Sequence, residues 1–300
     1  MNMSAVWLFL KGVAMGAADV VPGVSGGTIA FITGIYGELL DSIRSINLNA
    51  LKTLFRDGPQ AAWKAINGTF LLTLGSGILL ALVSLARVLH HLLLHYPVLL
   101  WAFFFGLIIA SCWHMGKTIA QWRWQELLAL VSGAVIAAFI SLASPTSIEP
   151  TTLIIFGAGS IAICAMILPG ISGSFILLLM GLYEPVLGAV RSGDIVLLGT
   201  FAAGAGLGLM LFSRVLSWLL HHYEHTLMAL LTGFMAGSLV KVWPWKETIS
   251  TRVNSKGEII PFIQQNSLPV VDDMFAVAVV LMVIGALVVL IMERVAVSHK

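Results

Sequence analysis

Two short stretches rich in proline, glycine and serine carry the residues best suited to chemistry in this 300-residue chain. Proline fixes φ and lacks a backbone donor, and glycine permits backbone that other residues resist, so each stretch should end one helix and begin another. A helix that begins there points free N–H groups at the break, and its dipole also attracts negative charge. We therefore predict an anion site, about the size of a phosphate, at these two motifs. The first motif comprises Pro22, Gly23, Ser25, Gly26, Gly27 and Thr28, and the second comprises Pro169, Gly170, Ser172, Gly173 and Ser174.

The two motifs belong to an internal repeat. Pro22 and Pro169 are separated by 169 − 22 = 147 positions, and the same offset places Gly34 and Tyr36 on Gly181 and Tyr183. A second block, beginning at Arg87 and again at Arg214, repeats with an offset of 214 − 87 = 127. Apolar bias alone could match leucines by chance, but it would not align Pro, Gly, Tyr and Arg in order. We therefore divide the chain into repeat 1 (residues 1–144) and repeat 2 (residues 145–300) of a single transmembrane domain.

Several ionisable side chains lie in or beside apolar stretches, where a charge is costly unless it is paired or hydrated. Arg87 and Arg214 are repeat equivalents, and a guanidinium can hold a phosphate through two parallel hydrogen bonds. The alternative is that each side chain extends to the nearer membrane interface. Arg44 and Arg191 are also equivalents, at segment ends, where they suit either headgroup contact or an orientation signal.

Three acidic residues flank the motifs and are candidates for coupling transport to a proton. They are Asp19, Glu38 and Glu184. Asp19 has no acidic counterpart, because Met166 occupies the equivalent position. The simpler interpretation is that these groups pair with nearby arginines at helix ends.

The composition requires a membrane. The chain is 59% hydrophobic and only 10% charged, whereas soluble domains have about 25% charged residues. With 29 glycines and no alternating strand pattern, helices are favoured over a β-barrel. A net charge of +2 does not indicate a nucleic-acid partner. We read residues 1–16, whose one charge is Lys11, as structural and not as a cleaved signal.

Ten apolar segments can be drawn, five in each repeat, separated by polar connections of which residues 41–68 and 243–272 are the longest. Because five is odd, the second repeat must enter the bilayer from the opposite face, and the same holds if the first pair of segments re-enters without crossing. We predict an all-α polytopic membrane protein of two inverted-topology repeats, each with a Pro-Gly-broken re-entrant hairpin and about three transmembrane helices. Whether 4–18 and 20–40 re-enter or fully span is left open. The segments are 4–18, 20–40, 69–94, 97–115, 126–143, 152–168, 169–190, 195–220, 226–242 and 273–292.

Lysine and arginine are more frequent in the connections on one side of this topology, which we take as cytoplasmic, with both termini inside. Histidines cluster at 90, 91 and 95 and at 221, 222 and 225, but both clusters lie at turns between helices. We expect them to be interfacial and predict no metal and no cofactor. An oligomer is compatible with the sequence.

The run from Gly16 to Thr28, followed by Gly34-Ile35-Tyr36, resembles the signature of a bacterial membrane family regarded as polyprenyl-phosphate transporters. The second motif resembles it too, and the similarity covers nearly the whole chain. The resemblance implies a flippase in the bacterial inner membrane that returns undecaprenyl phosphate, the carrier lipid of cell-envelope synthesis, to the inner leaflet. Its partners would be that substrate and the surrounding membrane lipid.

Two alternatives remain. Membrane-embedded polyprenyl-pyrophosphate phosphatases also combine inverted repeats with a Pro-Gly-x-Ser motif, followed there by an arginine and supported by paired glutamates. Here Gly26 and Gly173 occupy the arginine's place, and no Glu-x-x-x-Glu pair lies in an apolar segment. Without that local cation and acid, phosphoryl transfer is disfavoured, so we predict that the chain is not an enzyme. A non-transporting scaffold or ion channel would leave the duplicated motif unexplained.

Overall fold

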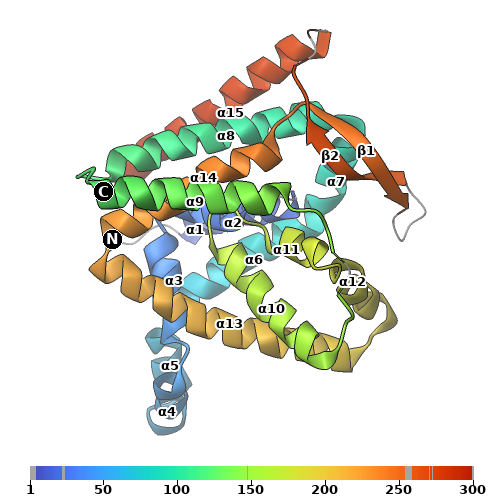
Figure 1. Cartoon of the computed structure of the whole chain (residues 1–300). Helices are drawn as coiled ribbons and strands as arrows, with labels where there is room; N and C mark the ends of the chain where they lie inside the picture. Colours follow the sequence, from blue (N-terminus) through green and yellow to red (C-terminus); the bar gives the residue numbers. More distant parts are fainter. Residues whose placement is uncertain are drawn as a thin grey trace.

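The computed structural model describes residues 5–21, 24–146, 148–253, 259–269, 271 and 273–298, as a bundle of helices with one β-hairpin (Figure 1). Pro22 and Gly23 of the first motif lie outside the described residues. The elements are α1 Ala5–Val20, α2 Gly26–Ile32, α3 Tyr36–Ser45, α4 Leu48–Arg56, α5 Pro59–Ala65, α6 Gly68–Ser84, α7 Ala86–His95, α8 Pro97–Thr118, α9 Trp124–Leu142, α10 Thr152–Ile167, α11 Gly173–Leu179, α12 Tyr183–Ser192, α13 Ile195–His222, α14 Glu224–Val242, β1 Lys246–Val253, β2 Ile259–Asn266 and α15 Asp273–Ser298.

Several helices have the length and composition of membrane spans. Among the described residues, α8, α9, α13, α14 and α15 each suffice alone, and the number rises to seven if each of two sharply bent helix pairs counts as one span. These pairs are α5 with α6, bent by 71°, and α11 with α12, bent by 108°. The chain is therefore a multi-pass helical membrane protein.

Long helices pack in four main pairs: α1 with α6, α10 with α13, α9 with α14, and α8 with α15. Glycines line each contact, so that backbones touch directly. At Gly12 and Gly77, on α1 and α6, an added Cβ would overlap a carbonyl oxygen of the facing helix, and the same is true of Gly159 and Gly204, on α10 and α13. Close backbone approach through small residues is the usual means of holding helices together in lipid, where apolar burial gives no net drive.

The structure corrects three of the predicted segments. Residues 20–40 and 169–190 are not single helices, because each is interrupted again at a glycine, Gly34 or Gly181, whose φ is +71° in both cases. A positive φ ends an α-helix, and glycine adopts it without a steric penalty. The predicted segment 69–94 likewise divides at Leu85 into α6 and α7.

The two long connections contain regular structure that the sequence does not predict. Residues 41–68 include α4 and α5, and residues 243–272 include the antiparallel hairpin of β1 and β2. The predicted helical, polytopic architecture is confirmed, and the small hairpin is an addition within one connection. In Figure 1 the two chain ends lie at the left of the bundle, and the hairpin and α7 lie at the right.

The short helix α2 lies at the centre of the packing. All seven of its residues are buried, and it contacts α1, α3, α8 and α10. Lys11 on α1 donates to the carbonyl of Thr33 at the end of α2 (2.8 Å), where a cation suits the negative end of the helix dipole. The part of the first motif that the structure describes, from Ser25 to Thr28, is thus buried inside the protein.

Candidate functional site

The first motif begins α2 with a cap supplied by its own neighbours. Ser25 has extended backbone, and its Oγ accepts a hydrogen bond from the amide of Gly27 (3.1 Å). The amide of Gly26 donates to Oδ1 of Asp19, the next-to-last residue of α1 (2.7 Å). A carboxylate at a helix N-terminus satisfies an orphan amide and interacts favourably with the dipole.

This geometry changes the interpretation of the first motif. The sequence predicts free N–H groups facing the break, but the structure pairs two of them, and Asp19 holds the position expected for a bound anion. Ser25 and Thr28 have no exposed surface. In this conformation the first motif is a closed anion site that contains the protein's own carboxylate.

The second motif differs from the first. Gly170 has φ +82°, and Ser172 has extended backbone but makes no side-chain cap to α11. Its hydroxyl instead lies 2.9 Å from that of Ser174. Met166 stands where the first motif has Asp19, so the second motif lacks an internal carboxylate.

The structure brings the two motifs into contact. Ser25 Oγ donates to the carbonyl of Met166, and the amide of Gly170 donates to Thr28 Oγ1, both at 3.0 Å. A Cβ added to Gly27 would lie 2.5 Å from the carbonyl oxygen of Ile167. The start of α2 therefore lies directly against the break between α10 and α11.

Among the described residues, no hydrogen bond joins the predicted arginines to this junction. Arg87 at the start of α7, Arg214 on α13 and Arg191 at the end of α12 have exposed side chains. Arg44, also exposed, donates to Ser217 Oγ on α13 (3.1 Å). Their contact with a phosphate stays a prediction.

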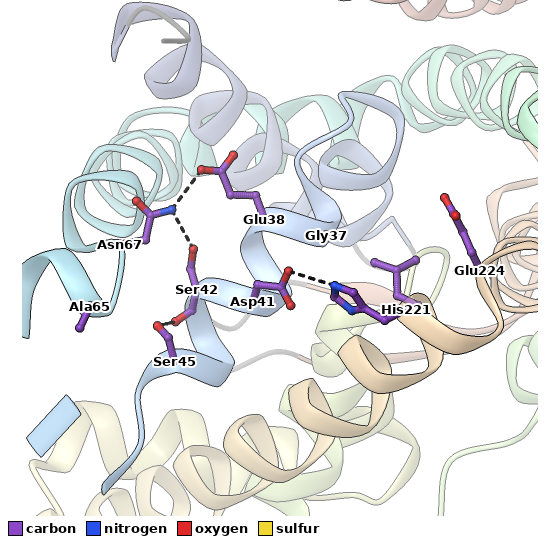
Figure 2. Close-up of a pocket in the computed structure, with 10 residues that line it drawn as sticks. Gly37, Glu38, Asp41, Ser42, Ser45, Ala65, Asn67, His221 and Glu224 are labelled. Atoms are coloured by element: carbon purple, nitrogen blue, oxygen red, sulfur yellow. Dashed lines mark hydrogen bonds and ion pairs between the residues drawn. The ribbon is translucent and has the colours of Figure 1, made fainter. Parts of the chain in front are cut away.

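An acidic pocket of about 690 Å³ opens beside α3, between the start of α6 and the junction of α13 with α14 (Figure 2). Asn67 Nδ2 donates to Glu38 Oε1 (3.0 Å) and to Ser42 Oγ (3.1 Å). His221 Nε2 lies 3.9 Å from Asp41 Oδ2. The pocket is lined by Gly37, Glu38, Asp41, Ser42, Ser45, Ala65, Asn67, Leu220, His221 and Glu224.

The acidic pocket does not suit a phosphate, because its three carboxylates, Glu38, Asp41 and Glu224, would repel it. It suits a proton or another cation, and it contains one of the three predicted proton-coupling residues. Glu184, the third, lies on α12, half-buried and apart from this pocket. The sequence interpretation omits Asp41; the available signal is that Asp41 and Arg44, three positions apart, share one face of α3.

Comparison with known proteins now identifies the family. Residues 15–260 match the family described as VCA0040-like, undecaprenyl phosphate translocase-like. The chain belongs to this family. The match covers both motifs, the end of α1 and the helices α2 to α14.

Two relatives in the translocase-like family have functional names. A polyprenyl-phosphate transporter of Vibrio cholerae is 52% identical over 268 residues, which cover 89% of this chain and 87% of the relative. A polyprenyl-phosphate transporter of Staphylococcus aureus is 33% identical over 259 residues, 79% of this chain and 86% of the relative. No solved structure matches the chain. The family resemblance predicted from the motifs is confirmed.

Proposed function

We propose that this protein transports a polyprenyl-phosphate lipid across the bacterial cytoplasmic membrane, returning undecaprenyl phosphate to the inner leaflet for reuse. Membership of the translocase-like family and the names of both relatives support the substrate. The observation that carries the mechanism is the contact between two interrupted helices through Ser25–Met166 and Thr28–Gly170. Non-helical backbone at membrane depth is tolerated only inside protein or beside a wet cavity, and discontinuous helices typically form the substrate sites of transporters.

Inverted-topology repeats account for the packing. Under the repeat, α1 and α6 correspond to α10 and α13, and these are two of the main helix pairs. Under the same repeat α8 corresponds to α14 and α9 corresponds to α15. The two remaining pairs, α9 with α14 and α8 with α15, are therefore equivalent to each other. The breaks at Gly34 and Gly181 are also bridged by equivalent backbone hydrogen bonds. Ile35 N donates to Ala30 O (3.0 Å), and Leu182 N donates to Leu177 O (2.9 Å). This arrangement supports the proposal of two re-entrant hairpins, one from each face.

Asp19 is the group through which a proton would act. As a carboxylate it holds the Gly26 amide; once protonated it loses its charge and most of its attraction for the amide end of α2. The lipid phosphate then replaces it between the two motifs, while the prenyl tail stays in lipid. Glu38, in the acidic pocket of Figure 2, is the second acidic group that we propose for carrying the proton.

Alternating access requires the two halves to separate at this junction. The hydrogen bonds from Ser25 and Gly170 must break for α2 to move away from α10. Each contributes about 0.5–1.5 kcal/mol net, an amount that a bound phosphate, with several charge-assisted hydrogen bonds, can replace. Both termini lie at the same end of the bundle, which we assign to the cytoplasm (Figure 1).

The deciding experiment is lipid return in reconstituted vesicles. Purified protein should move a polyprenyl phosphate between leaflets, and Arg87→Ala together with Arg214→Ala should slow the movement. Vesicles in which the wild-type protein moves no polyprenyl phosphate would refute the proposal. Release of inorganic phosphate from a polyprenyl pyrophosphate would instead favour the phosphatase alternative.

A further inference from the structure

Two lysines lie together where α14 leads into the hairpin. Lys241 is in the last turn of α14, and Lys246 is the first residue of β1. The ammonium of Lys246 donates to the carbonyl of Lys241 (2.6 Å). The sequence interpretation treats both only as signals of membrane orientation.

Each ammonium lies over an aromatic ring. Lys241 Nζ is 4.2 Å from the centre of the Phe175 ring, and Lys246 Nζ is 4.0 Å from the centre of the Trp101 ring. Cation–π contacts of this kind contribute modestly and do not neutralise a charge. Within the residues that the structure describes, neither ammonium makes an ion pair with a carboxylate.

Among the described residues, the two charges therefore have no carboxylate as counter-ion. Burial, together with the neighbouring ammonium of Lys241, lowers the pKa of Lys246 to about 7. The only acid adjacent to it in sequence, Glu247, has an exposed side chain on the hairpin. A half-buried pair of cations is costly unless an anion binds between or beside them.

The pair adjoins the second motif. Phe175, under Lys241, is the residue after Ser174 in the first turn of α11. The backbone of Gly170 also packs on α14, since an added Cβ would lie 2.7 Å from the carbonyl of Phe234. The second motif lacks the carboxylate that Asp19 supplies to the first. Beside it lie two cations that pair with no carboxylate in the described part of the chain.

We infer that Lys241 and Lys246 form the site that receives the phosphate of the lipid headgroup, with the paired hydroxyls of Ser172 and Ser174 as neighbouring donors. The inference rests on the proposed transport function and names the residues that recognise its substrate. In the proposed orientation the site faces the extracytoplasmic side, where a lipid returning to the inner leaflet is first bound. The ligand is a phosphate monoester, whose two negative charges match two ammonium groups.

Equilibrium binding to the purified full-length protein in detergent tests the site. Farnesyl phosphate is the probe, and farnesol and inorganic phosphate are the comparison ligands. Lys241→Gln and Lys246→Gln should each weaken farnesyl phosphate binding about tenfold or more, since each removes one charge-assisted contact. Farnesol binding should not change. If inorganic phosphate binds as tightly as farnesyl phosphate and with the same dependence on the lysines, the site serves free phosphate and the lipid assignment is wrong.

Lys117→Gln is the matched control, because Lys117 Nζ also lies over a tryptophan ring, Trp113 (4.8 Å), but away from the second motif. It should bind as the wild type does. The double variant Lys241→Arg with Lys246→Arg keeps both charges and should bind farnesyl phosphate, unlike the glutamine variants. This comparison separates the loss of a charge from a folding defect. Unchanged binding in the double glutamine variant would overturn the inference.

A transport measurement separates this inference from the proposed function. If the wild type binds farnesyl phosphate through the lysines but moves no lipid, the transport proposal fails and the site stands. If the wild type moves lipid and the double glutamine variant moves it equally fast, the site is wrong and transport stands.

Discussion

Replacing Gly27 with alanine perturbs the contact between the two motifs at a single atom. The new Cβ would lie 2.5 Å from the carbonyl oxygen of Ile167 and 3.0 Å from that of Met166. Carbon–oxygen contacts are ordinarily no closer than about 3.3 Å, so the helices must separate by roughly 0.8 Å. Both obstacles are backbone atoms, so no side-chain rotation can relieve the overlap.

The energetic cost follows from that displacement. Overpacking of this kind costs about 1–3 kcal/mol. The hydrogen bonds Ser25–Met166 and Gly170–Thr28, both 3.0 Å, would lengthen to about 3.8 Å, beyond hydrogen-bonding distance. Each is worth about 0.5–1.5 kcal/mol, so we expect Gly27→Ala to destabilise the closed junction by roughly 2–6 kcal/mol.

Denaturant unfolding of the purified protein, with lipid transport measured in parallel, checks this value. Gly157→Ala on α10 is the control, because an added Cβ there meets no atom within 4 Å. It should be neutral or up to about 1 kcal/mol more stable, since alanine favours helix more than glycine. Equal stability of the two variants would show that the motifs do not touch as described.

Three further predictions concern the same region. Thr28→Val keeps the side-chain shape but leaves the buried Gly170 amide without its acceptor, which should cost about 1–3 kcal/mol in unfolding free energy; Thr28→Ser should retain most of that stability. Asp19→Asn replaces a charge-assisted contact with the Gly26 amide by a neutral one, so it should lower the unfolding free energy by about 1 kcal/mol. It should also remove the pH dependence of transport. Transport that keeps its full pH dependence would exclude Asp19 as the coupling group. The pKa of Lys246 is lowered to about 7 in the free protein, and a bound phosphate should raise it, so binding takes up a proton above pH 7. The affinity for farnesyl phosphate should therefore fall as the pH rises from 7 to 9. An affinity that rises over this range would contradict the assignment.

The sequence predicts the motifs and the family, because these depend on residue types with strong local rules. Pro and Gly stop helices wherever they occur, and repeated offsets place two such stops at equivalent positions. The second break in each repeat is less visible, since Gly34 and Gly181 are single glycines in apolar runs. Only their common φ of +71° reveals that they end helices.

The lysine pair is hidden from the sequence for a different reason. Lys241 lies at the end of an apolar segment and Lys246 lies in the polar connection that follows, where lysine ordinarily marks a solvated surface. Their burial depends on the hairpin folding back on α14, through Asn266 Nδ2 to the carbonyl of Val240 (2.8 Å) and Trp243 Nε1 to that of Ser267 (2.9 Å). Long-range contacts of this kind leave no periodic pattern in the residues themselves.

The difference between the two motifs provides a last test of how the phosphate is held. One copy carries its own anion, Asp19, and the other has Met166 at that position with two cations nearby. Met166→Asp should give the second motif an internal carboxylate. The Met166 side chain already lies against the start of α11, since a Cβ added to Gly173 would be 2.6 Å from Met166 Cγ. That carboxylate would pair with the lysine site and compete with the phosphate, so farnesyl phosphate binding should weaken about tenfold or more.

Met166→Asn, of nearly the same shape and without charge, is the control and should bind as the wild type does. The comparison isolates charge from side-chain volume, because both variants remove the same thioether. Equal binding by the aspartate and asparagine variants would mean that the phosphate never approaches the second motif. In that case recognition would have to lie elsewhere, with the exposed guanidinium groups of Arg87 and Arg214 as the next positions to test.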